Sequence, residues 1–212
     1  MDVSETRSRL NALLMAAGLT PLDDATAGRF EDYLSLFVRW NERVNLSAIR
    51  DKEGIISRHV IESIIVSNVL PPGIRTLLDF GSGAGLPGIP IALCRPEIAV
   101  TLAESQGKKA AFLQEAVRVL GIQAKVHAGR AEALDGDFDC VILRAVDKMP
   151  EAVAAAVPLV APKGWLALMT TGADTAQLRK AAGAQISWGE PVKLPCSDDR
   201  ILALGRRINA AA

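Results

Sequence analysis

The sequence predicts an α/β protein in which a seven-stranded, mostly parallel sheet is wrapped by helices and follows a helical extension. Two observations support this prediction. From Ile74 onward, short apolar runs alternate with helical stretches, the pattern of a parallel sheet covered by helices. A short apolar strand also runs directly into a glycine-rich turn at 77–88, which leads into a helix. We therefore expect a helical extension over 1–72 and one compact domain over 73–212.

Composition limits the class of protein. A chain of 212 residues can bury one sizeable core but is too short for two full domains of ordinary size. Half of the residues are hydrophobic, and no run of eighteen apolar residues occurs, so the sequence predicts a globular protein that does not span a membrane. The polar residues 1–7 lack an apolar signal segment, which predicts a cytoplasmic location. The formal net charge is zero, so any nucleic-acid partner must bind a local patch.

Three helices are expected in the first seventy residues. Apolar residues at helical spacing form a first stripe, which ends at Gly18. A second amphipathic pattern runs from Phe30 to about Trp40, and its aromatic side chains are expected in the core. A polar connector follows at 41–47. The third helix is expected over about 52–69 and should end before the following Pro-Pro-Gly.

The remaining elements follow from the alternating pattern. Strands are expected at about 76–80, 98–103, 123–127, 138–143 and 165–170, with helices at about 87–94, 106–120, 148–157 and 173–182. Two further strands, at about 185–192 and 200–206, leave no room for a helix between them. These last two strands should therefore pair antiparallel.

The glycine-rich turn can bind a nucleotide-type ligand through its backbone. Gly81, Gly83 and Gly85 allow positive φ angles and close approach of a ligand to the main chain. The spacing Gly-x-Gly-x-x-Gly, ending at Gly88, also matches the dinucleotide fingerprint. However, a carboxylate at Asp79 would repel a pyrophosphate and attract a cationic ligand such as S-adenosylmethionine. We favour S-adenosylmethionine; a nicotinamide dinucleotide and a turn that only packs strand against helix remain alternatives.

Charged residues follow three of the expected strands. Glu104, at the tip of the second strand, is placed to accept both ribose hydroxyls of an adenosine-bearing cofactor, which fits either ligand. The third strand is followed by Arg130, Ala131 and Glu132. An adenine ring at this place would be bordered by their backbone and side chains. Arg144 ends the fourth strand, and after four apolar residues its guanidinium needs a partner. A structural salt bridge and a contact with substrate are both open for this arginine.

Two lysines begin the helix that follows Glu104. Lys108 and Lys109 lie in its first turn, where the helix dipole makes cations slightly unfavourable. An anionic partner such as an RNA phosphate would offset this cost, although a solvated helix face also explains either lysine alone.

Cysteine and histidine usage excludes several chemistries. Cys94, Cys140 and Cys196 form no C-x-x-C pair, so no zinc site is recognisable and a disulfide framework is not indicated. Cys140 lies in an apolar run and is expected in the core. His59 is expected on the third helix, close to Glu62. Since no serine occupies a nucleophile elbow, no hydrolytic triad is predicted.

Several ordered motifs together resemble one family. They are Asn-Leu-Ser-Ala-Ile-Arg at 45–50, Arg-His-Val-Ile-Glu-Ser at 58–63, the glycine loop with its Gly-Leu-Pro-Gly-Ile-Pro ending at 90, Glu-Ser-Gln-Gly-Lys-Lys at 104–109, Phe112-Leu113 and Arg144-Ala145. From about Leu34 to Arg207 the chain resembles the RsmG (GidB) family of bacterial small-subunit ribosomal RNA methyltransferases. It departs from the family pattern at Ser47, Ser82 and Leu143, and at Glu62, where aspartate is frequent.

The resemblance implies a class I methyltransferase fold, S-adenosylmethionine as methyl donor, and N7 of a specific guanine in the 530 loop of 16S rRNA as acceptor. The cofactor-binding residues it implies are Asp79, Gly81, Gly83, Gly85, Leu86, Glu104, Ala131, Glu132 and Arg144. Arg144, Asn45 and His59 would position the RNA, and no metal is expected. Guanine N7 has a lone pair and no proton, so the transfer requires alignment and desolvation but no general base.

The resemblance also implies a monomer that acts on 16S rRNA, within the small ribosomal subunit. Three other classes remain open from the residues alone. They are a nicotinamide oxidoreductase, a methyltransferase of small molecules with the N-terminal helices as a lid, and a non-catalytic binding module that retains the glycine loop for packing.

Overall fold

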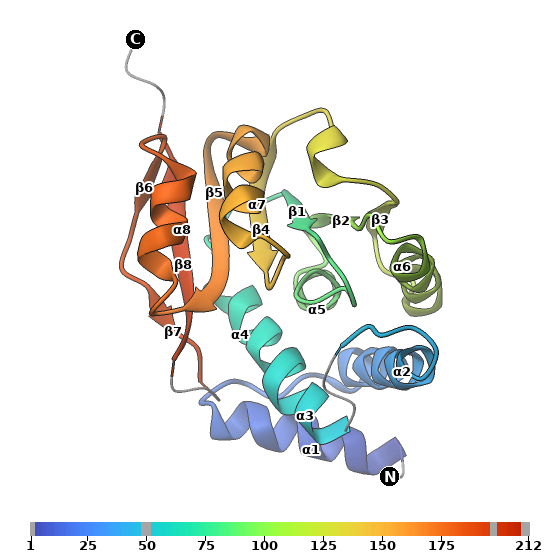
Figure 1. The fold of residues 1–212 in the computed structure, drawn as a ribbon. Coiled ribbons are helices and arrows are strands. Elements are labelled where there is room, and N and C mark those ends of the chain that lie inside the picture. Colours follow the sequence, from blue (N-terminus) through green and yellow to red (C-terminus); the bar gives the residue numbers. More distant parts are fainter. Residues whose placement is uncertain (1–2, 48–51, 196–198, 209–212) are drawn as a thin grey trace.

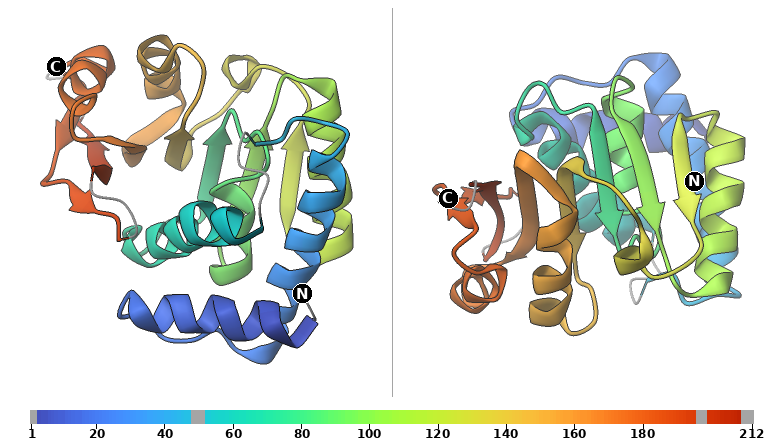
Figure 2. Two further views of the ribbon diagram at one scale, coloured as in Figure 1. Left: turned by 60° about the horizontal axis from the view of Figure 1, so that its bottom comes forward. Right: turned by 90° about the horizontal axis from the view of Figure 1, so that it is seen from above.

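The structure is a computed structural model that describes residues 3–47, 52–195 and 199–208. A twisted sheet lies between two layers of helices, and the N-terminal helices gather at one side of it (Figures 1 and 2). Cys196 and residues 48–50 of the motif that begins at Asn45 lie outside the described residues.

The sheet has eight strands in the described residues; seven of them form one continuous path, and β7 pairs with β8 beside it. The strands are β1 (Thr76–Phe80), β2 (Ala99–Ala103), β3 (Ala124–His127), β4 (Phe138–Arg144), β5 (Val160–Thr171), β6 (Ile186–Trp188), β7 (Val192–Lys193) and β8 (Arg200–Arg207). The path within the described residues is β3-β2-β1-β4-β5-β8-β6. Strands β1 to β5 are parallel, whereas β8 is antiparallel to β5 and to β6. The predicted α/β class and the antiparallel pairing of the last strands are confirmed.

The strand expected over 185–192 is divided into β6 and β7, which both pair with β8. Between them lie Gly189 and Pro191. Proline has no N–H to donate to a ladder, so it interrupts the pairing. Trp188 faces Gly205 and Val192 faces Leu202, so the outer strand contains one extra residue and forms a bulge. Strand β5 also begins earlier than expected, at Val160, with a register shift against β4.

The helices agree closely with the expected ranges. They are α1 (Val3–Ala16), α2 (Asp24–Asn41), α3 (Lys52–Ile55), α4 (Ile61–Val69), α5 (Gly88–Cys94), α6 (Gly107–Leu120), α7 (Met149–Ala156) and α8 (Thr175–Ala182). Helix α2 begins before Phe30 because Asp23 caps it by accepting the N–H of Thr26 at 2.9 Å. The helix expected over 52–69 contains a π-helical segment, Ile56–Val60, between α3 and α4. Helix α5 begins just after Pro87.

The hydrophobic core has two parts, one on each face of the sheet. Helices α7 and α8 cover one face (Figure 2). Leu78 and Val141 belong to the part of the core beneath them. The opposite face packs against α5, α6 and the N-terminal helices. There Tyr33, Phe37 and Phe112 are fully buried and pack ring against ring, as expected for the aromatics of α2. The core thus contains residues from both sides of the expected boundary between 72 and 73. The division into an extension and a domain remains a prediction.

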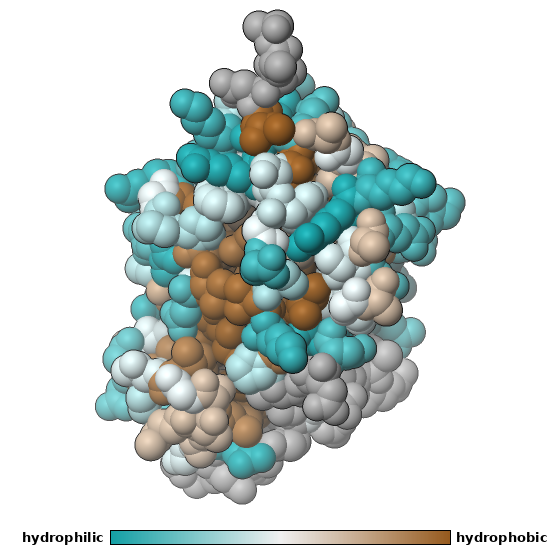
Figure 3. Space-filling view, turned by 90° about the vertical axis from the view of Figure 1, so that its left-hand side faces the viewer, coloured by the Kyte–Doolittle hydropathy of each residue, from teal (hydrophilic) through white to brown (hydrophobic). Residues whose placement is uncertain are grey.

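The side of the molecule that carries β6 and β8 shows an apolar area surrounded by hydrophilic residues (Figure 3). The sheet ends here at β6, which is only three residues long. A short edge strand leaves few backbone groups for pairing with another chain. None of the helices in the described residues is both long enough and apolar enough to cross a membrane.

Candidate functional site

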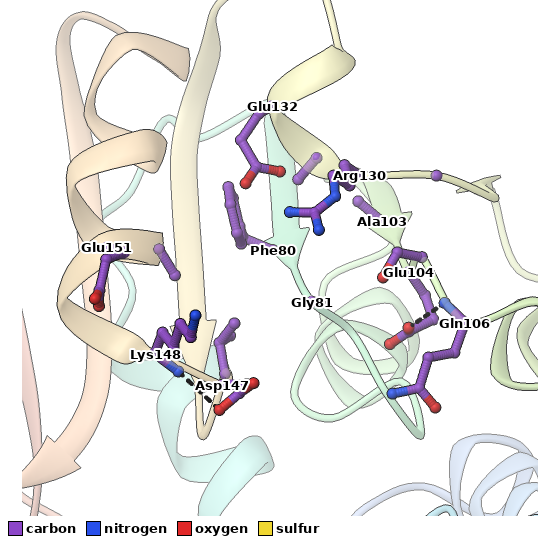
Figure 4. A pocket seen from close by; sticks show the side chains of 15 residues that line it. Phe80, Gly81, Ala103, Glu104, Gln106, Arg130, Glu132, Asp147, Lys148 and Glu151 are labelled. Atoms are coloured by element: carbon purple, nitrogen blue, oxygen red, sulfur yellow. Dashed lines mark hydrogen bonds between the residues drawn. The ribbon is translucent and has the colours of Figure 1, made fainter.

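A cleft of about 390 Å³ opens at the carboxyl ends of the central strands. Open α/β sheets bind their ligands at this edge. Each wall follows one strand: Phe80 and Gly81 follow β1, Ala103 to Gln106 follow β2, Gly129 to Glu132 follow β3, and Val146 to Lys148 follow β4. The side chains of Glu104, Arg130 and Glu132 lie on one side of the cleft, and Lys148 lies on the other (Figure 4).

The three loop glycines have different roles. All have positive φ: 73° at Gly81, 57° at Gly83 and 81° at Gly85. A Cβ at Gly81 would meet the Val146 side chain at 3.0 Å, so the wall after β4 lies directly against the loop. A Cβ at Gly85 would collide with Ile89 at 2.4 Å, which makes this glycine a packing position. Gly83 has open space where a Cβ would point. A ligand could therefore approach the backbone closely at Gly83.

Glu104 and Tyr33 hold the loop in place. The Glu104 carboxylate is buried and accepts the N–H of Gly83 at 2.9 Å and the N–H of Gln106 at 2.7 Å. A carboxylate has about four acceptor positions, so both oxygens can accept further bonds from ribose hydroxyls. The Tyr33 hydroxyl donates to the carbonyl of Ala84 at 2.7 Å, and burial raises the pKa of this hydroxyl far above its usual value. Helix α2 thereby anchors the loop.

Asp79 lies beneath the loop and does not line the cleft. Its carboxylate accepts the N–H of Gly88 at 3.0 Å and connects β1 to the start of α5. Burial raises the pKa of Asp79 to about 7, and the hydrogen bond from Gly88 opposes this rise. The attraction between Asp79 and a cationic cofactor, on which the preference for S-adenosylmethionine was based, remains a prediction.

The wall after β4 was not predicted. Val146, Asp147 and Lys148 line the cleft, and both Ala145 and Lys148 have positive φ, at 48° and 49°. Non-glycine residues rarely adopt this conformation, and such strain is concentrated at functional sites. Position is the signal that could have identified this wall, since these residues follow a parallel strand at the same edge as Glu104.

Arg144 lies at the centre of a buried polar cluster beside the cleft. One of its terminal nitrogens (Nη2) lies 3.0 Å from an oxygen of Glu62 and 2.6 Å from Nδ1 of His59. The Arg144 and Glu62 side chains are 5% and 1% exposed, and Arg200 approaches the second Glu62 oxygen at 3.7 Å. Burial lowers the pKa of Arg144, and the charge of Glu62 counteracts this effect. The structural salt bridge, one of the two open interpretations of Arg144, is therefore present.

The cluster fixes the tautomer of His59. Arginine can only donate, so Nδ1 of His59 accepts, and its Nε2 carries the proton of the neutral ring. Nε2 lies 3.2 Å from the hydroxyl of Ser47, whose oxygen can accept a hydrogen bond from this N–H. Asn41 shapes the connector, because its side-chain oxygen accepts the backbone N–H groups of Leu46 and Ser47.

The structure brings together only some of the predicted site residues. Gly81, Glu104, Ala131 and Glu132 line one cleft. Arg144 and His59 are in contact in the polar cluster. Asn45 lines a separate groove near the start of α6. Gly83, Gly85, Leu86 and Asp79 belong to the loop and its support and do not line the cleft. Their roles toward a ligand, like those of the cleft residues, remain predictions.

Comparison with known proteins identifies the family. A family model described as rRNA small subunit methyltransferase G (GidB) matches residues 27–202. The chain therefore belongs to the GidB family. It is 43% identical over 151 residues to ribosomal RNA small subunit methyltransferase G of Xanthomonas oryzae pv. oryzae, with 70% of each chain covered. The protein of the same name from Stenotrophomonas maltophilia is 40% identical over 178 residues, covering 82% of this chain and 83% of the other.

Solved structures confirm the predicted fold. A methyltransferase described as SAM-dependent, from Aquifex aeolicus, matches 73% of this chain and 93% of its own with a TM-score of 0.58 and 14% identity. The mitomycin 7-O-methyltransferase MmcR matches 97% of this chain and 69% of its own with a TM-score of 0.63 and 12% identity. The GidB-family chain thus has the class I methyltransferase fold, and S-adenosylmethionine is the cofactor that its family uses.

We predict that Glu104→Ala weakens the binding of S-adenosylhomocysteine about ten- to a hundredfold. Hydrogen bonds to a charged acceptor contribute roughly 1.5–3 kcal/mol, and the change also frees the Gly83 N–H that orders the loop. Isothermal titration calorimetry measures the effect. Glu151→Ala is the matched control, because it removes an acid from the opposite wall of the same cleft. A dissociation constant equal to that of the control would show that Glu104 does not bind the ribose.

Proposed function

We propose that this GidB-family protein transfers a methyl group from S-adenosylmethionine to N7 of a specific guanine in 16S rRNA. The main support is the family match over residues 27–202, which includes the glycine loop, the cleft and the polar cluster. The 530 loop, implied by the family resemblance, is the site that we propose within this RNA. We infer the small ribosomal subunit as the partner, a monomeric enzyme, and a cytoplasmic location because bacterial ribosomes are assembled there.

The residues of the cleft fit the adenosine part of this cofactor. Glu104 would hold the ribose hydroxyls, and Ala131 with Glu132 would border the adenine. Gly81 and Gly83 would leave the loop backbone accessible to the methionine part. When bound, the cofactor supplies a methyl group on a positively charged sulfur. The protein then has to hold the guanine in line with that group and exclude water.

Arg144, His59 and Asn45 are proposed to position the RNA. The contact between Arg144 and His59 orients both side chains before any substrate arrives. Such preorganisation lowers the entropy cost of aligning the guanine. No proton has to be removed from N7, so these residues would act by hydrogen bonding and charge rather than as a base.

The decisive experiment is transfer of tritiated methyl groups to small ribosomal subunits that lack this modification. We expect label in 16S rRNA, and nucleoside mass spectrometry should identify 7-methylguanosine. Label in a small-molecule fraction alone would overturn the proposal in favour of a small-molecule methyltransferase. Binding of NADH in place of S-adenosylhomocysteine, measured by calorimetry, would instead indicate an oxidoreductase.

A further inference from the structure

We propose that a basic groove between the end of α2 and the start of α6 binds the phosphate backbone of the RNA substrate. This inference rests on the proposed function and extends it to a second surface. The groove has a volume of about 380 Å³ and is lined by Arg43, Asn45, Gln106, Gly107, Lys108 and Lys109, together with Val44. These lining residues include three cationic side chains and no acidic one.

The three cations of the groove have no partner in the part of the chain that the structure describes. The side chains of Arg43, Lys108 and Lys109 form no hydrogen bond or ion pair with any described residue. Arg39, which is in the last turn of α2 and four residues before Arg43, differs because it pairs with Glu115 of α6 at 3.1 Å. The unpaired charges are therefore concentrated where the connector after α2 meets the start of α6.

The two lysines of the groove lie at the end of α6 where the helix dipole makes positive charge unfavourable. Lys108 and Lys109 occupy the first turn of α6, where the helix dipole already places positive charge. An anion in the groove would relieve the repulsion among these cations. Since the net charge of the chain is zero, this local excess of positive charge does not follow from composition.

The groove lies next to the cofactor cleft. Gln106 lines both hollows, and the adjacent Glu104 lines the cleft. A neighbouring hollow of about 460 Å³ shares Arg43 and Lys108 with the groove and extends it along α2 to Trp40. A chain of phosphates along this path would pass the mouth of the cleft, which favours a polyanion over a single bound phosphate. RNA is the polyanion whose guanine has to reach the methyl group of the cofactor.

The test replaces two of these cations, in the double variant Arg43→Ala/Lys108→Ala. We expect its affinity for unmethylated 16S rRNA, measured by filter binding, to fall about tenfold or more. The slope of log K against log salt concentration should decrease by about 0.7–0.9 for each phosphate that the variant no longer neutralises. Binding of S-adenosylhomocysteine should not change, because neither residue lines the cofactor cleft.

The double variant Lys180→Ala/Lys193→Ala is the matched control, since it removes the same charge from exposed positions on α8 and β7. If both double variants lose RNA affinity and salt slope equally, the groove is not a docking surface and the effect is one of net charge. An unchanged salt slope in the groove variant would also overturn the proposal. If inorganic phosphate competes as well as RNA at equal phosphate concentration, the groove is a small-anion site instead.

Methyl transfer by the unaltered protein separates this proposal from the proposed function. If the unaltered protein methylates small subunits and the groove variant matches it at limiting subunit concentration, only the groove proposal fails. If the unaltered protein methylates no RNA, the proposed function fails.

Discussion

Gly83→Val is expected to abolish detectable binding of S-adenosylhomocysteine while the protein still unfolds cooperatively. The space beside Gly83 is open, with only the carbonyl of Gly81 near, at 3.9 Å from an added Cβ. A branched side chain would fill the space through which a ligand reaches the loop backbone. The φ of 57° adds strain of about 1–2 kcal/mol, which lowers stability without unfolding the domain. Calorimetric titration and urea unfolding measure the two effects separately.

Two other glycines provide the controls for Gly83. Gly18 has a φ of 75° and nothing within 4 Å of an added Cβ, so Gly18→Val adds comparable strain far from the cleft. It should lose similar stability and keep its affinity. Gly85→Ala should behave in the opposite way, because its Cβ would collide with Ile89 at 2.4 Å and disturb the core. Normal binding by Gly83→Val would remove this loop from the cofactor site.

Local patterns were sufficient to predict most of the fold and part of the site. Strand β1 and the glycine turn were found because apolar runs, glycines and proline affect the conformation of their immediate neighbours. Glu104 was found because parallel strands all end at one edge of the sheet, so a residue at a strand tip is placed by topology alone. Boundaries were less accurate where a cap or bulge decides them, as at Asp23 and Pro191.

The contacts that complete the site join residues distant in sequence, which no local pattern encodes. The bond from Tyr33 to Ala84 crosses 51 positions, and the pair of Arg144 with Glu62 crosses 82. Tyr33 was expected in the core and is buried, but its hydroxyl also supports the loop. The sequence alone does not decide whether Arg144 forms a structural salt bridge or contacts substrate. The decision depends on the burial of its partner Glu62, which is set by how α4 packs against the end of β4.

The π-helical segment connects these observations to the proposed function. It covers Ile56–Val60 and includes His59, whose ring contacts Arg144. A π turn inserts one residue into a helix and rotates the following side chains, and such turns are frequent at functional sites. The backbone carbonyl of His59 also accepts a hydrogen bond at 2.6 Å from the hydroxyl of Ser63, which lies in α4. We infer that the turn brings the imidazole to the arginine.

Arg144→Ala is expected to lower the free energy of unfolding by about 3–5 kcal/mol, the cost of removing one partner of a buried ion pair. For a protein of this size that corresponds to a fall in Tm of roughly 6–20 °C. The Glu62 carboxylate, 1% exposed, would lose the Arg144 guanidinium at 3.0 Å, and Arg200 lies farther from it, at 3.7 Å. Thermal and urea unfolding measure the loss. The expected loss of stability follows from the structural role of Arg144 alone. A contact with RNA would be a second role of the same side chain.

Two further variants separate the structural role of Arg144 from its proposed contact with substrate. Arg200→Ala should cost no more than about 1 kcal/mol, because its side chain is 29% exposed and its distance from Glu62 is long. The double variant Glu62→Gln/Arg144→Met removes both charges and should recover much of the stability that Arg144→Ala loses. If it then binds S-adenosylhomocysteine normally but transfers no methyl group, Arg144 acts on the RNA as well as on Glu62. A fall of only a few degrees in the Tm of Arg144→Ala would contradict the buried pair and leave substrate positioning as its main role.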